Sequence, residues 1–266
     1  MTINRGKSIP PATICERIEA TDMSECEVKK INDYVYYIPA SETPLSGDVC
    51  VIYGENATYV YDVGSTAEML DFLHSLEKPF DIVCSHFHAD HVWWLTDHKP
   101  GEPGVRDDDK LSLNYKKPEY RNLYVSSETF RHTKAGTLIN ERITVYDRIK
   151  TIMENESTES KGVLKLDIIP CPTSHCKGSL LLMVNDDIIF AGDSVYCRDY
   201  TDENGEHHAA YNTQLLKSQI ELLESLPAEK IFMSHNKKPL RPKKVALREL
   251  SAVYSHREPG KSEIIM

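Results

Sequence analysis

The feature that most constrains this chain is a cluster of three histidines and an aspartate within six positions, at His86, His88, Asp90 and His91. The apolar run 80–84 comes directly before it and predicts a buried strand, so the cluster lies where a strand ends and a loop begins. Side chains two positions apart on an extended segment point the same way, so His86 and His88 can share one metal ion. Asp90 and His91 then turn toward a second position. Imidazoles and a carboxylate suit zinc or iron, whereas calcium and magnesium prefer oxygen ligands, so the pattern predicts a metal site. The alternative is a group of solvated surface histidines.

Three further short motifs follow in chain order, each after an apolar run that predicts a strand. His175 lies in a Pro-x-x-His turn, Asp193 in a Gly-Asp pair, and His235 after a final apolar run. An earlier aspartate, Asp62, ends another such run. Each short motif alone is weak evidence, and the ordered set is strong.

The ordered set resembles the metallo-β-lactamase superfamily over residues 30–240. One departure is Asn236, which follows the last histidine where relatives usually carry a Gly-His-Gly turn. The resemblance implies an α/β fold, an αβ/βα four-layer sandwich of two mixed β-sheets packed face to face with helices outside. Periodicity alone supports only the α/β class.

The resemblance also implies a ligand set for two divalent metal ions, with zinc expected and iron or manganese as alternatives. The implied ligands are, for the first metal, His86, His88 and His175; for the second, Asp90, His91 and His235; and for the bridge between them, Asp193.

This ligand set implies a hydrolase. A water held between two metal ions loses its proton near neutral pH, and the hydroxide attacks a carbonyl or phosphoryl centre. We expect cleavage of a small ester, thioester or lactone. The alternatives are a phosphodiesterase of the same fold and an iron-dependent sulfur dioxygenase. His88 argues against a flavodiiron protein, the retained ligand set argues against a non-enzymatic module, and the lack of a visible export signal argues against a dedicated β-lactamase.

Asp90 and Tyr196 are the candidate catalytic residues. Tyr196 lies three residues after Asp193, and in similar lactone-hydrolysing relatives a tyrosine near there hydrogen-bonds the substrate carbonyl. A core or gate tyrosine is the alternative. Asp62 is expected to orient the ligand loop rather than to bind metal, or else to cap a turn.

Basic residues follow His235 closely, and they either attract an anionic substrate or form a solvated face. They are Lys237, Lys238, Arg241, Lys243 and Lys244. His207 and His208 lie in a polar loop and are interpreted as surface residues.

Composition limits the partners. Lysine and arginine total 31 against 41 aspartates and glutamates, a formal charge of −10, which disfavours nucleic acid and leaves a small-molecule substrate. No stretch approaches the roughly 20 apolar residues that span a bilayer, so no membrane association is expected. Seven scattered cysteines, an odd number, fit reduced thiols in the cytoplasm. Two of them, Cys171 and Cys176, flank His175 and are either metal-sensitive or simply packed. The sequence is silent on oligomeric state, and a homodimer is compatible with it.

The chain is expected to form an N-terminal arm over 1–28 and one domain over 29–266. An inserted loop or lid is predicted around 93–121, a stretch rich in proline, glycine and charge. It begins with Trp93 and Trp94, which either line the substrate site or pack in the core.

Local patterns predict several further elements. A Ser-x-x-Glu capping box at Ser65 predicts the start of a helix. The remaining expectations are strands at 33–38, 48–53 and 58–62, an edge strand at 122–126, a helix at 142–153, a polar linker at 155–161, strands at 163–169, 180–184 and 188–191, a helix from Thr213 to Leu226, and a last helix at 242–257.

Overall fold

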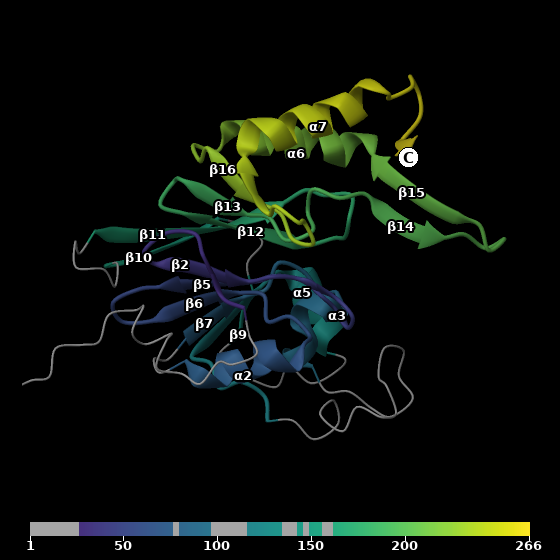
Figure 1. Ribbon diagram of the computed structural model, residues 1–266. Helices are drawn as coiled ribbons and strands as arrows, with labels where there is room; N and C mark the ends of the chain where they lie inside the picture. The colour runs from purple at the N-terminus through teal and green to yellow at the C-terminus, as the bar shows by residue number, and fades with distance from the viewer. Residues whose placement is uncertain (1–26, 77–79, 97–115, 135–142, 146–148, 156–161) are drawn as a thin grey trace, which may run out of the picture.

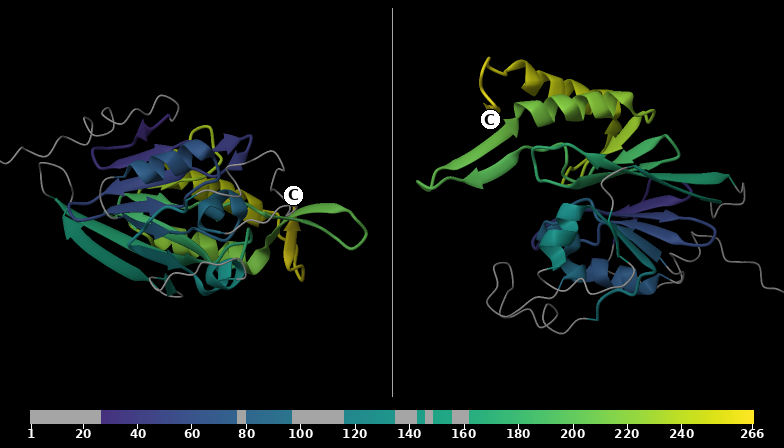
Figure 2. Two further views of the ribbon diagram at one scale, coloured as in Figure 1. Left: turned by 90° about the horizontal axis from the view of Figure 1, so that it is seen from below. Right: turned by 180° about the vertical axis from the view of Figure 1, so that it is seen from behind.

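Two β-sheets packed face to face, with helices on their outer sides, form the body of the protein (Figure 1). The computed structural model describes residues 27–76, 80–96, 116–134, 143–145, 149–155 and 162–266. Helix α2 (Ala67–Ser75) covers the first sheet, while α6 (Thr213–Ser225) and α7 (Lys243–Ser255) cover the second (Figures 1 and 2). The expected αβ/βα sandwich of two mixed sheets is confirmed.

The first sheet has seven strands in the order β1-β2-β5-β6-β7-β8-β9. Their bounds are β1 (Lys29–Lys30), β2 (Val35–Ile38), β5 (Val49–Tyr53), β6 (Thr58–Tyr61), β7 (Phe80–Val83), β8 (Asn122–Val125) and β9 (Ile143–Val145). Strands β6 to β9 are parallel, and Tyr61 pairs with Val83. Because parallel strands end at the same edge, Asp62 and the histidine cluster emerge side by side.

The second sheet has six strands in the order β10-β11-β12-β13-β16-β17. Their bounds are β10 (Lys150–Asn155), β11 (Val163–Cys171), β12 (Ser179–Val184), β13 (Ile188–Phe190), β16 (Lys230–Phe232) and β17 (Leu240–Pro242). Its single parallel pair is β13 with β16, in which Phe190 lies opposite Phe232. That register brings the loop holding Asp193 next to the loop holding His235.

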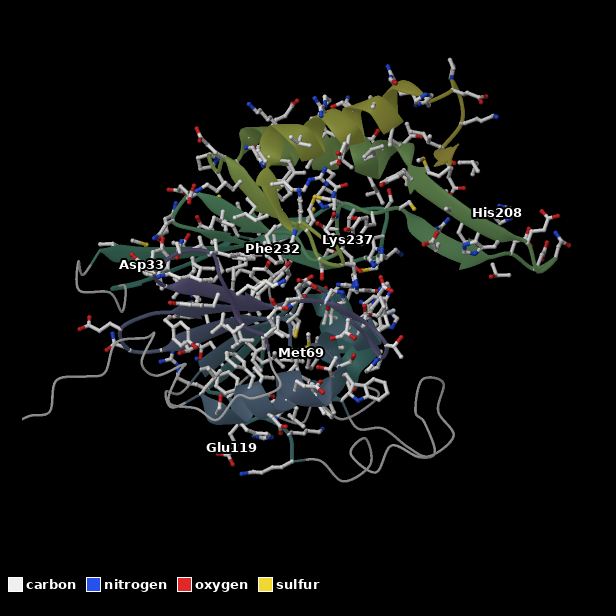
Figure 3. The ribbon with its side chains drawn as sticks, in the orientation of Figure 1. Asp33, Met69, Glu119, His208, Phe232 and Lys237 are labelled. Atoms are coloured by element: carbon white, nitrogen blue, oxygen red, sulfur yellow. The ribbon has the colours of Figure 1, made fainter. Side chains whose placement is uncertain are left out.

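Three apolar layers hold the sandwich together. Met69 and Leu73 of α2 pack on the outer face of the first sheet, Tyr61 and Phe232 lie between the sheets, and Leu223 of α6 packs on the second sheet. Figure 3 labels Met69 in the first of these layers and Phe232 in the second. Full burial of side chains of this size contributes about 1.5–3 kcal/mol each, so the layers supply the main driving force for folding.

Smaller elements complete the structure. They are the hairpin of β3 (Ser41–Glu42) and β4 (Leu45–Ser46), helix α3 (Ala89–Val92), the 3₁₀ turn η1 (Trp93–Leu95), helix α5 (Ser127–Lys134), and a three-stranded sheet of β14 (Arg198–Thr201), β15 (His207–Asn212) and β18 (Glu263–Ile265). The β14–β15 hairpin projects from the body and carries His207 and His208 on a strand where the sequence suggested a loop (Figures 1 and 3).

The helix expected at 142–153 is wrong, because this stretch contributes strands β9 and β10. Along β10, Thr151 and Met153 are exposed while Ile152 is partly buried against the core between the sheets. This alternation is the period of a strand. A short apolar pattern fits a helix and a strand equally well, and a neighbouring strand that offers hydrogen bonds decides between them. Here β11 pairs with β10 over its whole length.

The position of one strand and the start of one helix also differ from expectation. Strand β8 is not at an edge, since it pairs with β7 on one side and β9 on the other. Helix α2 is capped by Thr66 rather than Ser65: the Thr66 hydroxyl accepts a hydrogen bond from the Met69 N–H, and Ser65 instead donates its hydroxyl to the Leu45 carbonyl. The capping box therefore predicted the correct helix, but it placed the capping residue one position too early.

The predicted lid can be followed only at its ends. Trp94 is 2% exposed and donates its indole N–H to the Thr66 carbonyl at 2.9 Å, and Trp93 packs beside it against the core under α2. The core alternative is confirmed for Trp94, and neither tryptophan is among the residues that line the pocket described below. Most of the predicted arm (1–26), of the lid (97–115) and of the linker (156–161) lies outside the described residues. Among the helices that the structure describes, none is long and apolar enough to cross a membrane.

Candidate metal centre

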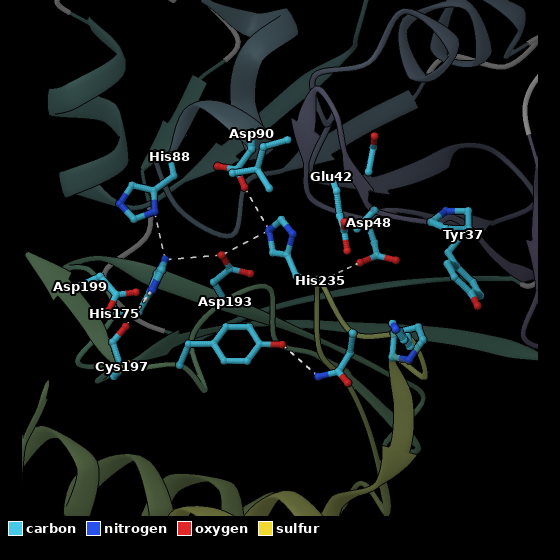
Figure 4. A pocket seen from close by; sticks show the side chains of 18 of the residues that line it. Tyr37, Glu42, Asp48, His88, Asp90, His175, Asp193, Cys197, Asp199 and His235 are labelled. Atoms are coloured by element: carbon cyan, nitrogen blue, oxygen red, sulfur yellow. Dashed lines mark hydrogen bonds and ion pairs between the residues drawn. The ribbon is translucent and has the colours of Figure 1, made fainter. Parts of the chain in front are cut away.

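The seven candidate ligands converge at one edge of the sandwich, where strands from both sheets end. Figure 4 shows the five of them that line the pocket, His88, Asp90, His175, Asp193 and His235. His86 and His88 follow β7, and Asp90 and His91 lie on α3. The other three follow β11, β13 and β16 of the second sheet: His175, Asp193 and His235. A pocket of about 650 Å³ opens over them. Residues separated by as many as 149 positions thus meet only when the two sheets pack.

The first group of donors includes His86, His175 and Asp193. Ligand atoms of His86, His175 and Asp193 all lie within 4.8 Å of one another, and His175 Nε2 is 3.0 Å from His88 Nδ1. His86 Nε2 is buried and has no hydrogen-bond partner among the described residues. Ring nitrogens that face each other around a shared space fit a metal ion.

A second group comprises Asp90, His91, Asp193 and His235, again within 4.8 Å of one another. His235 Nε2 is 3.0 Å from Asp90 Oδ2, and His91 Nε2 is 3.3 Å from Asp193 Oδ2. The same Asp193 oxygen lies 3.6 Å from His175 Nε2 and 3.5 Å from His235 Nε2. Asp193 is therefore the residue common to both groups.

The electrostatics favour a cation at the centre. Burial lowers the pKa of His86 well below its ordinary value and that of His88 to about 4, which keeps both imidazoles neutral. Burial by itself raises the pKa of Asp193, but His91 and the other nearby histidines hold it below its ordinary value. His86 and His88 are thus already in the neutral form that metal binding requires. Burial lowers the pKa of His91 and of His235, but Asp62 and Asp193 raise that of His91 well above its ordinary value and Asp90 and Asp193 raise that of His235, so a metal ion would displace a proton from these two rings.

Hydrogen bonds at Nδ1 fix which ring nitrogen of His91 and of His175 faces the centre. Asp62 Oδ2 lies 2.7 Å from His91 Nδ1, and Asp62 Oδ1 accepts the Ser85 N–H at 2.6 Å. His175 Nδ1 lies 3.2 Å from the Cys197 carbonyl. A carboxylate or carbonyl partner requires an N–H at Nδ1, which leaves Nε2 free to bind a metal. The expectation that Asp62 orients the ligand loop is confirmed.

Gly192 permits the close approach of the two halves. Its φ is +52°, and a Cβ added there would come within 2.7 Å of the Ser85 Cβ. A side chain at this position would push the loop that carries Asp193 away from the histidine cluster.

Tyr196 lines the pocket, but its hydroxyl is engaged in the wall. It donates to the Ser234 carbonyl at 2.5 Å and accepts a hydrogen bond from the Asn236 amide at 3.0 Å. Burial raises its pKa to about 12, so the hydroxyl stays protonated. Asn236, the residue that departs from the family pattern, is therefore the partner of Tyr196. Contact of Tyr196 with a substrate stays a prediction, as does a catalytic role of Asp90.

The basic residues after His235 and the cysteines beside His175 lie near the candidate ligands. Lys237 lines the pocket, whereas Arg241 pairs with Glu249 at 2.6 Å on the surface. Cys171 is buried, and Cys176, which lies within 4.8 Å of ligand atoms of His86 and His88, is partly exposed. Burial raises the pKa of the Cys176 thiol to about 11.

Sequence reasoning missed Asp48 and Ser234. Asp48 begins a strand and Ser234 precedes a candidate ligand, and neither pattern signals a role by itself. In the structure the two are hydrogen-bonded to each other beside His235.

Comparison with known proteins agrees with this geometry. A family model described as the metallo-beta-lactamase superfamily matches residues 43–235. Among solved structures, a metallo-beta-lactamase superfamily protein from the archaeon Sulfolobus tokodaii is similar in fold, with 19% identity over 86% of this chain and 89% of that chain and a TM-score of 0.51. No curated protein matches.

Two further solved structures share the fold. A flavo-diiron protein variant from Thermotoga maritima has 11% identity over 89% of this chain and 64% of that chain, with a TM-score of 0.54. The inverting sec-alkylsulfatase from Pseudomonas sp. has 12% identity over 86% of this chain and 42% of that chain, with a TM-score of 0.55. At these identities the likeness concerns the fold alone.

Proposed function

Because this chain belongs to the metallo-β-lactamase superfamily, we propose that it is a metal-dependent hydrolase of a small ester, thioester or lactone. The observation that carries the proposal is Asp193, whose carboxylate is common to two groups of inward-facing histidine nitrogens beneath an open pocket. Fold neighbours with different names show that the fold does not fix the substrate, so the substrate class rests on the site.

The residues present fit two divalent ions. His86, His88 and His175 would hold the first, Asp90, His91 and His235 the second, and Asp193 would bridge them. Zinc matches this set of nitrogen and carboxylate donors, with iron or manganese as alternatives. When bound, such ions polarise a carbonyl and lower the pKa of a water molecule to near 7.

The protein's own groups then bind and orient the reactants. Asp90 lines the pocket with its Oδ2 3.0 Å from His235 Nε2, and it would accept a hydrogen bond from an attacking water. Tyr196 forms part of the pocket wall, and its hydroxyl would reach a substrate carbonyl by giving up its hydrogen bonds to the Ser234 carbonyl and the Asn236 amide. A pocket of about 650 Å³ matches a small molecule, and Lys29, Lys237 and Glu42 are among the residues that line it.

The cellular setting is part of the proposal. The described cysteines are all free, which supports a reducing compartment such as the cytoplasm. The partner is a small molecule rather than nucleic acid, in keeping with the charge of −10.

Metal analysis and a substrate panel test the function together. Protein purified without added metal is expected to carry close to two zinc ions per chain and to hydrolyse members of a panel of esters, thioesters and lactones. Removal of the metal with a chelator should abolish hydrolysis, and added zinc should restore it. Turnover confined to phosphodiesters would favour the phosphodiesterase alternative, and one iron per chain with oxygen consumption on a persulfide would favour the dioxygenase. Either result would overturn the proposal.

A further inference from the structure

We propose that Asp48 is a positioning residue of the metal centre, which holds the backbone of His235 so that its imidazole reaches the second donor group. This inference rests on the proposed function, because it concerns the site at which the second ion would bind.

Asp48 connects the two halves of the sandwich at the site. It lies just before β5 of the first sheet, and its Oδ2 accepts hydrogen bonds from the His235 N–H and the Ser234 hydroxyl, both at 3.0 Å. The Ser234 oxygen in turn accepts the Asp48 N–H at 2.9 Å. Asp48 and Ser234 are each 3% exposed, so water competes little for these bonds. Three hydrogen bonds thus join segments that are 186 and 187 positions apart.

His235 needs such support because its backbone is strained. Its φ is +59°, in the left-handed region that a residue with a Cβ rarely adopts. A strained conformation of this kind persists only where the surrounding structure over-determines it. The Asp48 carboxylate binds the N–H of this same residue, so it acts on the backbone that sets the direction of the ring.

The segment around Asp48 contacts the other side of the second group as well. The Gly47 N–H donates to the Asp90 carbonyl at 3.0 Å. A Cβ added to Gly47 would lie 2.5 Å from the His91 ring, so the backbone of this residue packs directly on that imidazole. Residues 47 and 48 therefore hold Asp90, His91 and His235 from one short stretch of chain.

Asp48 itself is not available as a ligand. Its Oδ2 is used twice, and its carboxyl also accepts a hydrogen bond from the Ala40 backbone N–H. Figure 4 shows the carboxylate behind His235, on the side away from Asp90 and Asp193. Its position differs from that of Asp62, which contacts the ring of His91, because Asp48 acts through the backbone.

Metal titration of stripped protein tests the inference. In Asp48→Ala, zinc should bind the first equivalent as tightly as in the unmodified protein, and the second about 10- to 100-fold more weakly, the usual cost of removing a group that orients a ligand. Asp48→Asn should recover most of the second-site affinity, because the amide oxygen can still accept the His235 N–H. The exposed Asp33→Asn is the matched control and should bind both equivalents normally.

The outcomes separate this inference from the function. If the unmodified protein binds no zinc, both the proposed function and the inference are overturned. Unmodified protein that binds two equivalents, with Asp48→Ala binding both as tightly, would overturn the inference alone. If Asp48→Ala does not fold, the near-isosteric Asp48→Leu takes its place, because it also removes the acceptor for the His235 N–H. Weaker second-site binding in Asp48→Leu than in Asp48→Asn supports the inference, and equal second-site affinity in the two overturns it. A melting temperature measured for each variant shows whether the titrated protein is folded.

Discussion

At the scale of single residues, the centre depends on one carboxylate. Asp193 Oδ2 lies between 3.3 and 3.6 Å from nitrogens of His91, His175 and His235, and Asp193 Oδ1 has no hydrogen-bond partner among the described residues. A buried carboxylate in this position is expected to act through its charge. Asparagine has nearly the same shape as aspartate but no charge, so a substitution by asparagine tests the charge alone.

Asp193→Asn should therefore weaken binding of the second metal equivalent more than the first and reduce the hydrolytic rate by more than about 100-fold. The loss follows because the neutral amide no longer offsets repulsion between two cations. Zinc titration with parallel kinetics measures both effects. Asp199→Asn removes another carboxylate from the same pocket, one outside both donor groups, and should keep both equivalents. Two equivalents bound by Asp193→Asn as tightly as by the unmodified protein would rule out the bridge.

At the scale of elements, α6 shows how a helix holds the ligand-bearing sheet in place. The Asn212 side chain accepts hydrogen bonds from the N–H groups of Gln214 and Leu215 at its first turn. Its buried face packs on the second sheet, and the buried Gln219 amide donates to the Ser194 carbonyl, next to Asp193. The helix thus supports the loop that carries the shared carboxylate.

Leu223→Ala should lower the free energy of unfolding by about 2–5 kcal/mol, because the side chain is 0% exposed and its removal leaves a cavity under α6. Leu215→Ala is the matched control: at 37% exposure on the same helix it should change stability by about 0.5 kcal/mol. Urea denaturation of the two variants measures the difference. Equal stability of the two would contradict the packing of α6 on the sheet.

At the scale of the whole molecule, a metal centre built from both halves links metal binding to folding. The ligands His86 to His91 come from the first sheet, and His175, Asp193 and His235 from the second. The unfolded chain does not bring these groups together, so bound metal stabilises the folded state.

Metal removal should therefore lower the melting temperature. A ligand present at about 100 times its dissociation constant stabilises the folded state by about 2.7 kcal/mol. Thermal unfolding with and without a chelator measures the shift, and His175→Ala should show a smaller shift because it has lost a ligand. A melting temperature that is independent of metal in the unmodified protein would contradict the link.

The cluster from His86 to His91 stands out in the sequence by residue type alone, and the ordered motifs that resemble the superfamily pointed to His175, Asp193 and His235. His86, Asp193 and His235 each stand three residues after a strand, and imidazoles and carboxylates suit one chemistry, so this part of the site could be read from local sequence. The helix from Thr213 was equally readable, since its apolar period runs unbroken until Pro227. These features depend on neighbours in the chain.

Tertiary structure alone decided features that depend on distant partners. Residues 150–155 form a strand because β11 offers hydrogen bonds along their whole length, and Trp94 lies in the core because α2 begins above it. The role inferred for Asp48 was invisible because its partners lie 186 and 187 positions away, and nothing in the residues around it encodes that distance. Neighbours in the chain set the apolar periodicity around a residue, and its side chain sets its chemistry. The packing of the two sheets determines which distant backbone groups that side chain contacts.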